Sequence, residues 1–140
     1  MSAMAATLTL EVVTPEGTIF SEPVSMVTLP ASEGQIGVYP QHVPLITQVV
    51  PGEIIVATAT GERLLAVGEG VVEIAADRVS IITDMAIPAE RIDEVAVEEA
   101  RQRAAARLND KLSDEEVASV NASLVRALAQ LQVKKRHRRV

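Results

Sequence analysis

Two histidines, His42 and His137, are the side chains of this chain best suited to proton transfer or metal binding near neutral pH. They fall in segments that we expect to form different domains, so a histidine-rich metal site is not expected. The sequence contains 0 Cys, which excludes a thiolate nucleophile, a disulfide and a cysteine-ligated zinc site. Because His42 stands between Pro40 and Pro44, we interpret it as a loop-fixing or contact residue rather than a catalyst.

Motifs of nucleotide and acyl chemistry are also missing. The sequence has neither a Gly-x-Ser-x-Gly elbow nor a Walker-type loop. The run Gly34-Gln35-Ile36-Gly37 lacks the third glycine of a dinucleotide fingerprint and joins strands instead of opening a helix. We therefore expect no catalytic residue, no metal and no cofactor. An enzyme would require two carboxylates that only the fold could bring together.

The segment Ser32–Leu45, SEGQIGVYPQHVPL, is dense in residues that shape the backbone. Glycine allows positive φ and close approach, whereas proline fixes φ and removes a donor. This composition predicts a rigid loop between strands, and such loops often carry recognition surfaces. The candidate contact residues are Gly34, Gln35, Gly37, Tyr39, Pro40, His42 and Pro44.

Residues 1–87 must position this loop, and their pattern is that of short β-strands. The run Thr7–Val12 alternates with period two and places Leu8 and Leu10 on one face. The other predicted strands cover residues 24–29, 53–58, 63–67, 71–75 and 79–83, with turn signals between them. The pattern predicts an all-β sandwich domain.

Residues 88–140 have a helical period and predict an antiparallel two-helix hairpin. The first helix is expected over residues 88–108, and Ser113-Asp114-Glu115-Glu116 predicts a capping box that opens the second. The expected seam pairs an apolar row on the second helix with an alanine-rich row on the first. These rows are Val117, Val120, Leu124, Leu128 and Leu131 against Ile92, Ala96, Ala100, Ala104 and Leu108.

An alanine seam buries little apolar area, which leaves two interpretations of the hairpin. It is either a mobile element whose helices can separate, or a stabilising appendage packed on the sandwich.

The charges are distributed unevenly along the chain, whose net charge is −6. Of the 13 Lys and Arg residues, only Arg63 and Arg78 precede position 87. Five cations form a basic tip, Lys134, Lys135, Arg136, Arg138 and Arg139. The tip suits an acidic protein partner or a solvated tail, whereas the acidic body and scarce aromatics argue against nucleic acid.

Taken together, these motifs resemble the epsilon subunit of bacterial F-type ATP synthases over essentially the whole chain. The resemblance is carried by LEVVTPEGTIFSEPVSMVTLP at residues 10–30, the loop pattern at residues 34–45 and VVEIAADRVSIITDMAI at residues 71–87. It implies a non-catalytic subunit of the central rotor stalk, peripheral to the membrane at the cytoplasmic face of the bacterial inner membrane. The β-domain would dock on the gamma subunit and on the c-ring loops through the segment around Gln35 and His42. Proton-driven rotation of the c-ring would thereby reach the catalytic head.

The resemblance also implies that an extended hairpin reaches the alpha and beta subunits and inhibits ATP hydrolysis. Some members of the family bind ATP at the hairpin through a motif that begins Ile-Asp-x-x-Arg-Ala. Here Ile92 and Asp93 match, but Ala96 replaces the arginine. Arg103 and Arg126 fall on further ligand positions, whereas Gln130 replaces another arginine. Each lost charge-assisted bond costs about 1.5–3 kcal/mol, so we expect weak or no ATP binding.

An interpretation from a different class remains open at this point. The chain could be a freestanding β-sandwich binding module whose helical tail drives oligomerisation through the seam at residues 117–131. Co-purification with gamma would favour the stalk subunit, and self-association would favour the binding module.

Overall fold

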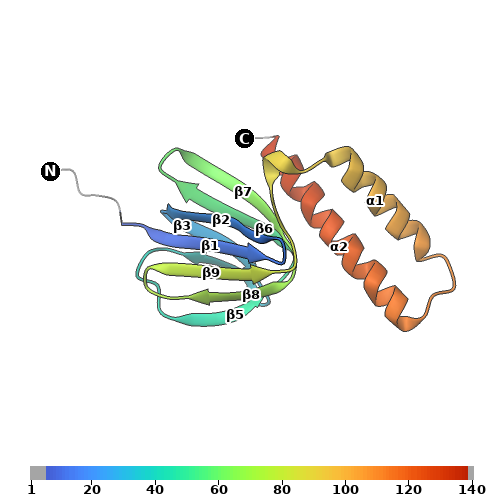
Figure 1. The fold of residues 1–140 in the computed structure, drawn as a ribbon, viewed down its shortest axis with the longest axis horizontal. Helices are drawn as coiled ribbons and strands as arrows, with labels where there is room; N and C mark the ends of the chain where they lie inside the picture. Colours follow the sequence, from blue (N-terminus) through green and yellow to red (C-terminus); the bar gives the residue numbers. More distant parts are fainter. Residues whose placement is uncertain (1–5, 139–140) are drawn as a thin grey trace.

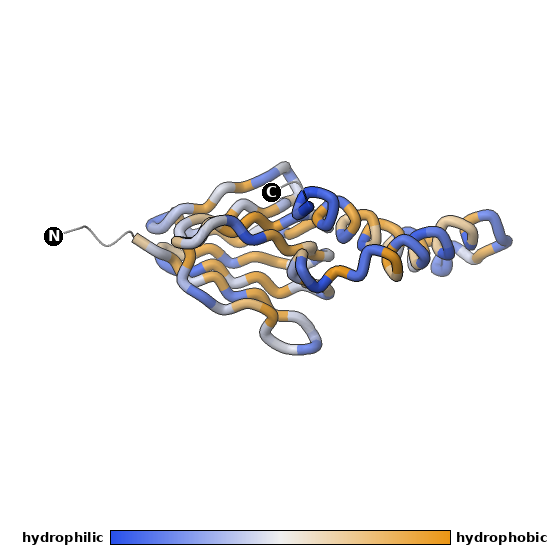
Figure 2. Tube along the Cα trace, turned by 90° about the horizontal axis from the view of Figure 1, so that it is seen from above, coloured by the Kyte–Doolittle hydropathy of each residue, from blue (hydrophilic) through white to orange (hydrophobic). Residues whose placement is uncertain are grey.

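The computed structural model describes residues 6–138, which form a β-sandwich and a helical hairpin at one end of it (Figures 1 and 2). The helix α2 lies next to the sandwich, and α1 lies on the far side of α2 (Figure 1). The elements in chain order are β1 (Leu8–Thr14), β2 (Gly17–Val24), β3 (Met26–Ala31), β4 (Gly34–Val38), β5 (Leu45–Val49), β6 (Gly52–Thr58), β7 (Gly61–Val67), β8 (Gly70–Ile74), β9 (Arg78–Thr83), β10 (Ala86–Pro88), the 3₁₀ turn η1 (Ala89–Arg91), α1 (Glu94–Arg107) and α2 (Asp114–His137).

Within the described residues, the strands form one hydrogen-bonded sheet in the order β10-β7-β6-β3-β5-β8-β9-β1-β2, and β4 pairs with β3. The pair of β1 with β9 is parallel, and the other pairs are antiparallel. The sheet folds over on itself, so that alternate side chains of each strand meet inside. Leu8, Leu10 and Val12 of β1 point into this core, as their alternation predicts.

A second, smaller apolar cluster lies outside the sandwich. Successive residues of β6 and β7 point to opposite faces, so Leu65 joins the core while its neighbours Leu64 and Ala66 face the hairpin. We call the buried residues of this cluster the joint: Leu64, Ala66, Ala89, Ile92 and Val133. The joint attaches the end of α2 to the sheet.

The sandwich followed by a hairpin is confirmed, but several predicted elements differ. The segment Ser32–Leu45 is not a single loop, because β4 occupies its first half and pairs with β3. The strands β2, β4, β5 and β10 are additional to those that the sequence pattern predicts. Glycine and proline in β2, β4 and β10 hide their alternation, and tertiary pairing supplies what propensity does not.

The first helix begins later than predicted, at Glu94 instead of Pro88. Pro88 ends β10, which pairs with β7, and Asp93 then caps α1 by accepting a bond from the Ala96 N–H at 3.1 Å. The second helix starts as predicted. Ser113 and Glu116 exchange the two bonds of a capping box, each at 3.2 Å.

The predicted seam is wrong in part. Val120 and Ala104 are buried, but Val117, Leu128, Ala96 and Leu108 are exposed. The reason is that α2 has two neighbours rather than one. It contacts α1 along one side and β6, β7 and η1 along another, so its buried residues are Val120, Ala127, Ala129 and Val133.

Candidate functional site

The seven contact residues predicted in segment 32–45 do not form one patch. Gly34 and Gln35 begin β4, directly after the β3–β4 turn, whereas Tyr39, Pro40, His42 and Pro44 lie beyond the other end of β4, and Gly37 lies within that strand. Gly34 has φ +121°, which explains the glycine at the start of β4. The segment therefore provides two separate contact points joined by a strand.

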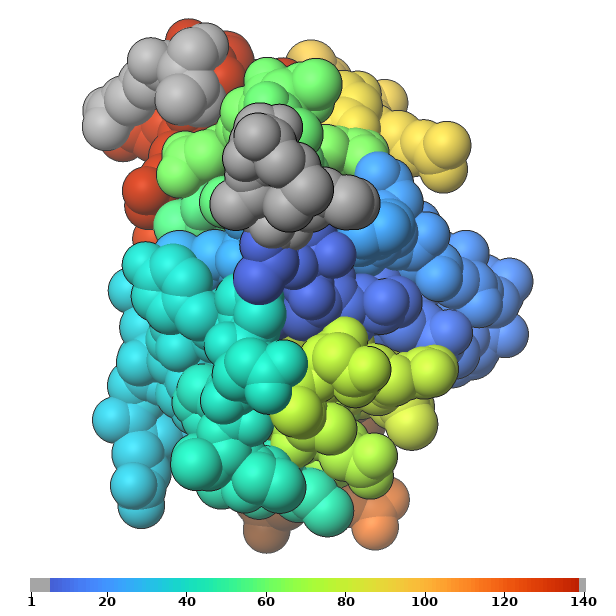
Figure 3. Space-filling model, turned by 90° about the vertical axis from the view of Figure 1, so that its left-hand side faces the viewer, coloured from blue at the N-terminus to red at the C-terminus, as the bar shows by residue number. Residues whose placement is uncertain are grey.

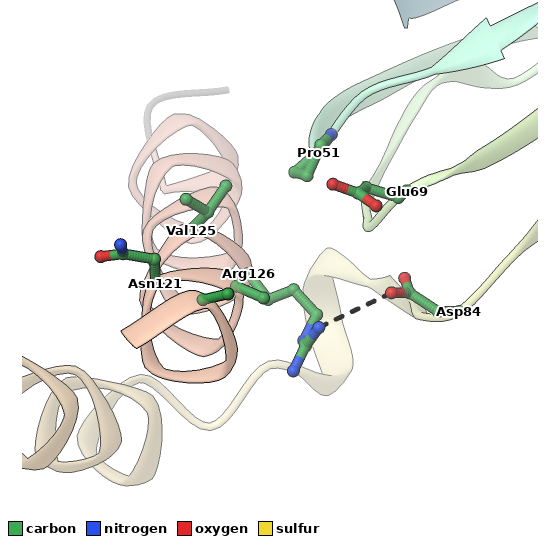
Figure 4. Close-up of a pocket in the computed structure, with 8 residues that line it drawn as sticks. Pro51, Glu69, Asp84, Asn121, Val125 and Arg126 are labelled. Carbon is green, nitrogen blue, oxygen red and sulfur yellow. Dashed lines mark ion pairs between the residues drawn. The ribbon is translucent and has the colours of Figure 1, made fainter. Parts of the chain in front are cut away.

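The first contact point, at Gln35, is exposed and lies near the hairpin. The neighbouring β5–β6 turn is tied to β3 by a bond from the Val50 N–H to the Pro30 carbonyl at 3.0 Å. That turn also carries Pro51, which faces α2 (Figure 4). Gln35 thus presents an uncharged amide at the hairpin end of the sandwich.

The second contact point, residues 39–44, lies at the end of the sandwich remote from the hairpin, beside the β8–β9 turn (Figure 3). The Gln41 N–H donates to the Ala76 carbonyl and fixes this neighbourhood, with Gln41 at φ +70°. His42 bonds through Nδ1 to the Val43 carbonyl at 2.6 Å, which orients its ring within the loop. Tyr39 is 62% exposed and Val43 72%. The loop is fixed by its backbone while its apolar side chains face solvent.

Sequence reasoning missed a surface that continues this loop across the sheet. We call it the outer face: the exposed row Ile46, Val71 and Ile82, with half-buried Val13 at its end. Val71 lies opposite Ile82, which lies opposite Val13, so the row crosses β8, β9 and β1. Together with Glu11, Glu73 and Ser80 it lines a shallow depression of about 500 Å³. The outward positions of these strands are unusually apolar for a solvated face, and that signal was available in the sequence.

The four candidate nucleotide residues have separate roles in the structure. Ile92 is buried in the joint, and Asp93 caps α1. Arg103 lies on α1 with an exposed side chain. Arg126 points to the sandwich and pairs with Asp84, its Nη1 lying 3.6 Å from Oδ2 (Figure 4). No hydrogen bond or ion pair joins any two of these four side chains in the part of the chain that is described.

A pocket of about 290 Å³ lies between α2 and the turns of the sandwich. Pro51, Glu69 and Asp84 line it from the sandwich, and Asn121 and Arg126 line it from α2 (Figure 4). The pair of Arg126 and Asp84 is about one-third to one-half exposed, so it contributes little to stability. Packing between α2 and the sheet is therefore loose along this part of the helix.

The basic tip is held more closely. Lys134 Nζ donates to the Ala89 carbonyl at 3.2 Å, Arg136 Nη1 lies 2.9 Å from Glu53 Oε1, and Arg138 pairs with Glu94 at the start of α1. Lys135 is exposed, and Arg139 lies outside the described residues. Three cations of the tip are thus engaged within the chain when the hairpin lies against the sandwich.

Among residues 6–138, no helix combines the length and apolar character that crossing a membrane requires, and no group of three or more His, Cys, Asp or Glu side chains is arranged to hold a metal.

The titratable groups with shifted pKa values are few. Burial raises the pKa of Glu53, with Arg136 acting in the opposite direction. A backbone hydrogen bond, supported by Arg63, lowers the pKa of Glu90. Glu53 is the one buried carboxylate of the described residues, at 7% exposed.

Comparison with known proteins assigns both parts of the chain. The family model "ATP synthase, Delta/Epsilon chain, beta-sandwich domain" matches residues 7–89, and its companion "long alpha-helix domain" matches residues 90–135. The ATP synthase epsilon chain of Alkalilimnicola ehrlichii is 38% identical over 135 residues, covering 96% of each chain. That of Herpetosiphon aurantiacus is 39% identical over 129 residues, covering 92% of this chain and 95% of the relative.

A solved structure shares the fold at lower identity. A chain in the Euglena gracilis mitochondrial ATP synthase, described as OSCP/F1/c-ring, matches with a TM-score of 0.76 and 23% identity, covering 94% of this chain and 82% of its own length. The resemblance inferred from the sequence motifs is confirmed by the family models and by the full-length relatives. The chain belongs to the ATP synthase delta/epsilon family and is similar over more than nine-tenths of its length to bacterial epsilon chains.

Proposed function

We propose that this chain is the epsilon subunit in the central stalk of a rotary ATP synthase, where it passes c-ring rotation to the catalytic head. The observation that carries the proposal is the near-complete coverage of epsilon relatives by a chain with the same order of domains. Residues 1–87 would dock on the gamma subunit and the c-ring, and residues 88–140 would regulate ATP hydrolysis. The chain itself would catalyse no reaction. The subunit would be peripheral, held at the cytoplasmic face of a bacterial inner membrane by its complex.

The outer face is the surface that we assign to the gamma subunit. An exposed apolar row on a sheet is costly in water and is typical of a subunit contact. Ile46 is 68% exposed and Ile82 65%, and the row continues into Val43 of the loop at residues 39–44. A contact with gamma over this face would include Tyr39, Pro40, His42 and Pro44 at its edge.

The start of β4, at Gly34 and Gln35, is the point that we assign to the polar loops of the c-ring. It is exposed and separate from the outer face, so the chain could touch gamma and the ring at once. Because Gln35 is an amide, hydrogen bonds rather than an ion pair would form this contact. The contact should therefore depend weakly on salt.

The hairpin is the element that we assign to inhibition of ATP hydrolysis. Docked, it occupies the position described here; extended, it would bring the basic tip to acidic segments of the alpha and beta subunits. The loose packing between α2 and the sandwich, with its pocket and half-exposed ion pair, supports a hairpin that can leave. Two such states need to differ by only a few kcal/mol.

The test is ATP hydrolysis by the cognate catalytic complex with the full chain or with residues 1–93. The truncation is placed after Asp93 because a cut after residue 87 would divide β10 and remove η1. We expect inhibition by the full chain alone, with binding to gamma retained by a truncated chain whose β-structure is verified by circular dichroism. Equal inhibition by both would make the hairpin structural. Absence of binding by either form would refute the assignment to the stalk.

A further inference from the structure

Docking of the hairpin buries a carboxylate on the outside of the sheet. Glu53 of β6 lies directly opposite Ala66 of β7, and Ala66 belongs to the joint that α2 covers. Its neighbour Ile54 points into the core, so Glu53 points to the face toward the hairpin. The burial of Glu53 therefore depends on the presence of α2.

The buried carboxylate is only half satisfied. Oε1 accepts from Arg136 at 2.9 Å, whereas Oε2 is buried without a hydrogen-bond partner among the described residues. Desolvation of an ion can exceed the attraction of its partner, and an unpaired buried oxygen adds to this cost. Arg136 itself keeps 53% of its side chain exposed, so it would lose little by remaining in water.

An apolar side chain of α2 stabilises docking of the hairpin in the same region. Val133 is 0% exposed and packs with Leu64, Ala66, Ala89 and Ile92 one turn before Arg136. We propose that Val133 anchors the docked hairpin and that Glu53 is its release point, meaning the residue whose burial opposes docking. The burial of Glu53 is tolerated only because Arg136 neutralises its charge. Docking and the proposed inhibitory contact then compete for the same cation. This last step rests on the proposed function, whereas the anchor and release point do not.

The groups around Glu53 determine the sign of the pH dependence. The charges of Arg136 of α2 and Glu62 of β7 act on Glu53, while His137 of α2 acts on Glu90 of η1. Burial raises the pKa of Glu53 in the docked state, so this state binds more protons than an undocked one. Docking is therefore favoured below the raised pKa and weakens as pH rises through it.

The test measures the docked fraction of the full chain by the distance between two spin labels. The sequence has 0 Cys, so single cysteines introduced at exposed Gln48 and Ser119 carry the labels without competing thiols. Arg136→Gln should lower the docked-to-undocked ratio roughly tenfold, because it leaves a buried charge unpaired. Glu53→Gln should leave docking intact, and the double variant should restore it.

Controls separate the release point from general charge effects. Lys135→Gln removes the same charge from the adjacent, exposed position and should leave docking unchanged. As pH rises above the ordinary range of a glutamate carboxyl, the parent should lose docked population, Glu53→Gln should not, and His137→Gln should behave as the parent.

The proposal is overturned if Glu53→Gln undocks the hairpin as much as Arg136→Gln does, because the pair would then be a simple clamp. A single docked distance in every variant, or a pH dependence that persists in Glu53→Gln, would also overturn it. None of these measurements requires the ATP synthase complex. Their failure is thus distinguishable from failure of the hydrolysis assay.

Discussion

The core of the sandwich and the joint beneath α2 are both apolar, but the core contains many more buried side chains than the joint. The core joins side chains from nearly every strand, including fully buried Leu10, Leu29 and Ile54. In the joint, two of the buried residues are alanines, and one side chain of α2, Val133, provides its contact. Since stabilisation scales with buried apolar area, the hairpin should be lost long before the sandwich. The difference shows how one chain can keep a rigid docking domain and a releasable arm.

The largest effect should come from the core. Ile54→Ala removes a fully buried side chain and should lower the free energy of unfolding of the sandwich by about 2–5 kcal/mol. Urea denaturation monitored by the β-sheet signal measures this change. A loss below about 1 kcal/mol would mean that the core tolerates cavities and that the contrast with the joint is false.

A smaller and local effect should come from the joint. Val133→Ala should weaken docking by roughly 1–3 kcal/mol, because it removes two buried methyl groups. The stability of the sandwich in urea should remain unchanged. Leu128→Ala is the matched control, since Leu128 lies on the same helix but is 48% exposed. If Val133→Ala lowered the stability of the sandwich in urea as much as it weakened docking, the hairpin and the sandwich would form one unit.

The basic tip should contribute to inhibition through charge. Replacing Lys135 alone with Ala should weaken inhibition of hydrolysis while leaving docking unchanged, because Lys135 is exposed in the docked state. Replacing all five cations should weaken inhibition further, and the loss should shrink as salt is added. Unchanged inhibition by the fivefold variant at low salt would remove the tip from the inhibitory contact.

The smallest effect should be that of ATP. Because Arg126 is paired with Asp84, its guanidinium is not free to bind phosphate groups in the docked hairpin, and the Asp93 carboxylate is already engaged as the cap of α1. Titration calorimetry with the full chain should give a Kd weaker than about 0.1 mM, or no signal. Tighter binding that is abolished by Arg126→Ala would show that the hairpin closes around the nucleotide.

Much of the fold is predictable from local patterns, and the differences have physical causes. The alternation of Leu8, Leu10 and Val12 and the capping box at Ser113 are local signals, and both are confirmed. The joint could not be predicted, because Leu64, Ile92 and Val133 come together only through tertiary packing. Local pattern favours a helix start at Pro88, yet pairing with β7 places this residue in a strand.

In the candidate site, too, local patterns predict some features and tertiary packing determines the others. Motif density identifies segment 32–45, but β4 separates its contact residues into two points. The outer face requires the register of β8 and β9 to bring Val71 beside Ile82. The role of Glu53 is not visible in the sequence, because its burial comes from a helix about eighty residues later in the chain.

Native-state hydrogen exchange of the full chain tests the separable stability of the two regions most directly. Most helical stability in proteins comes from tertiary packing, and undocking removes the packing of α2 on the sandwich, so it should open the amides of the hairpin to exchange. We predict that α1 and α2 exchange at a lower free energy than the strands of the sandwich, and that Val133→Ala accelerates exchange in the helices alone. Exchange of helices and strands at one common free energy, shifted together by Val133→Ala, would contradict the account.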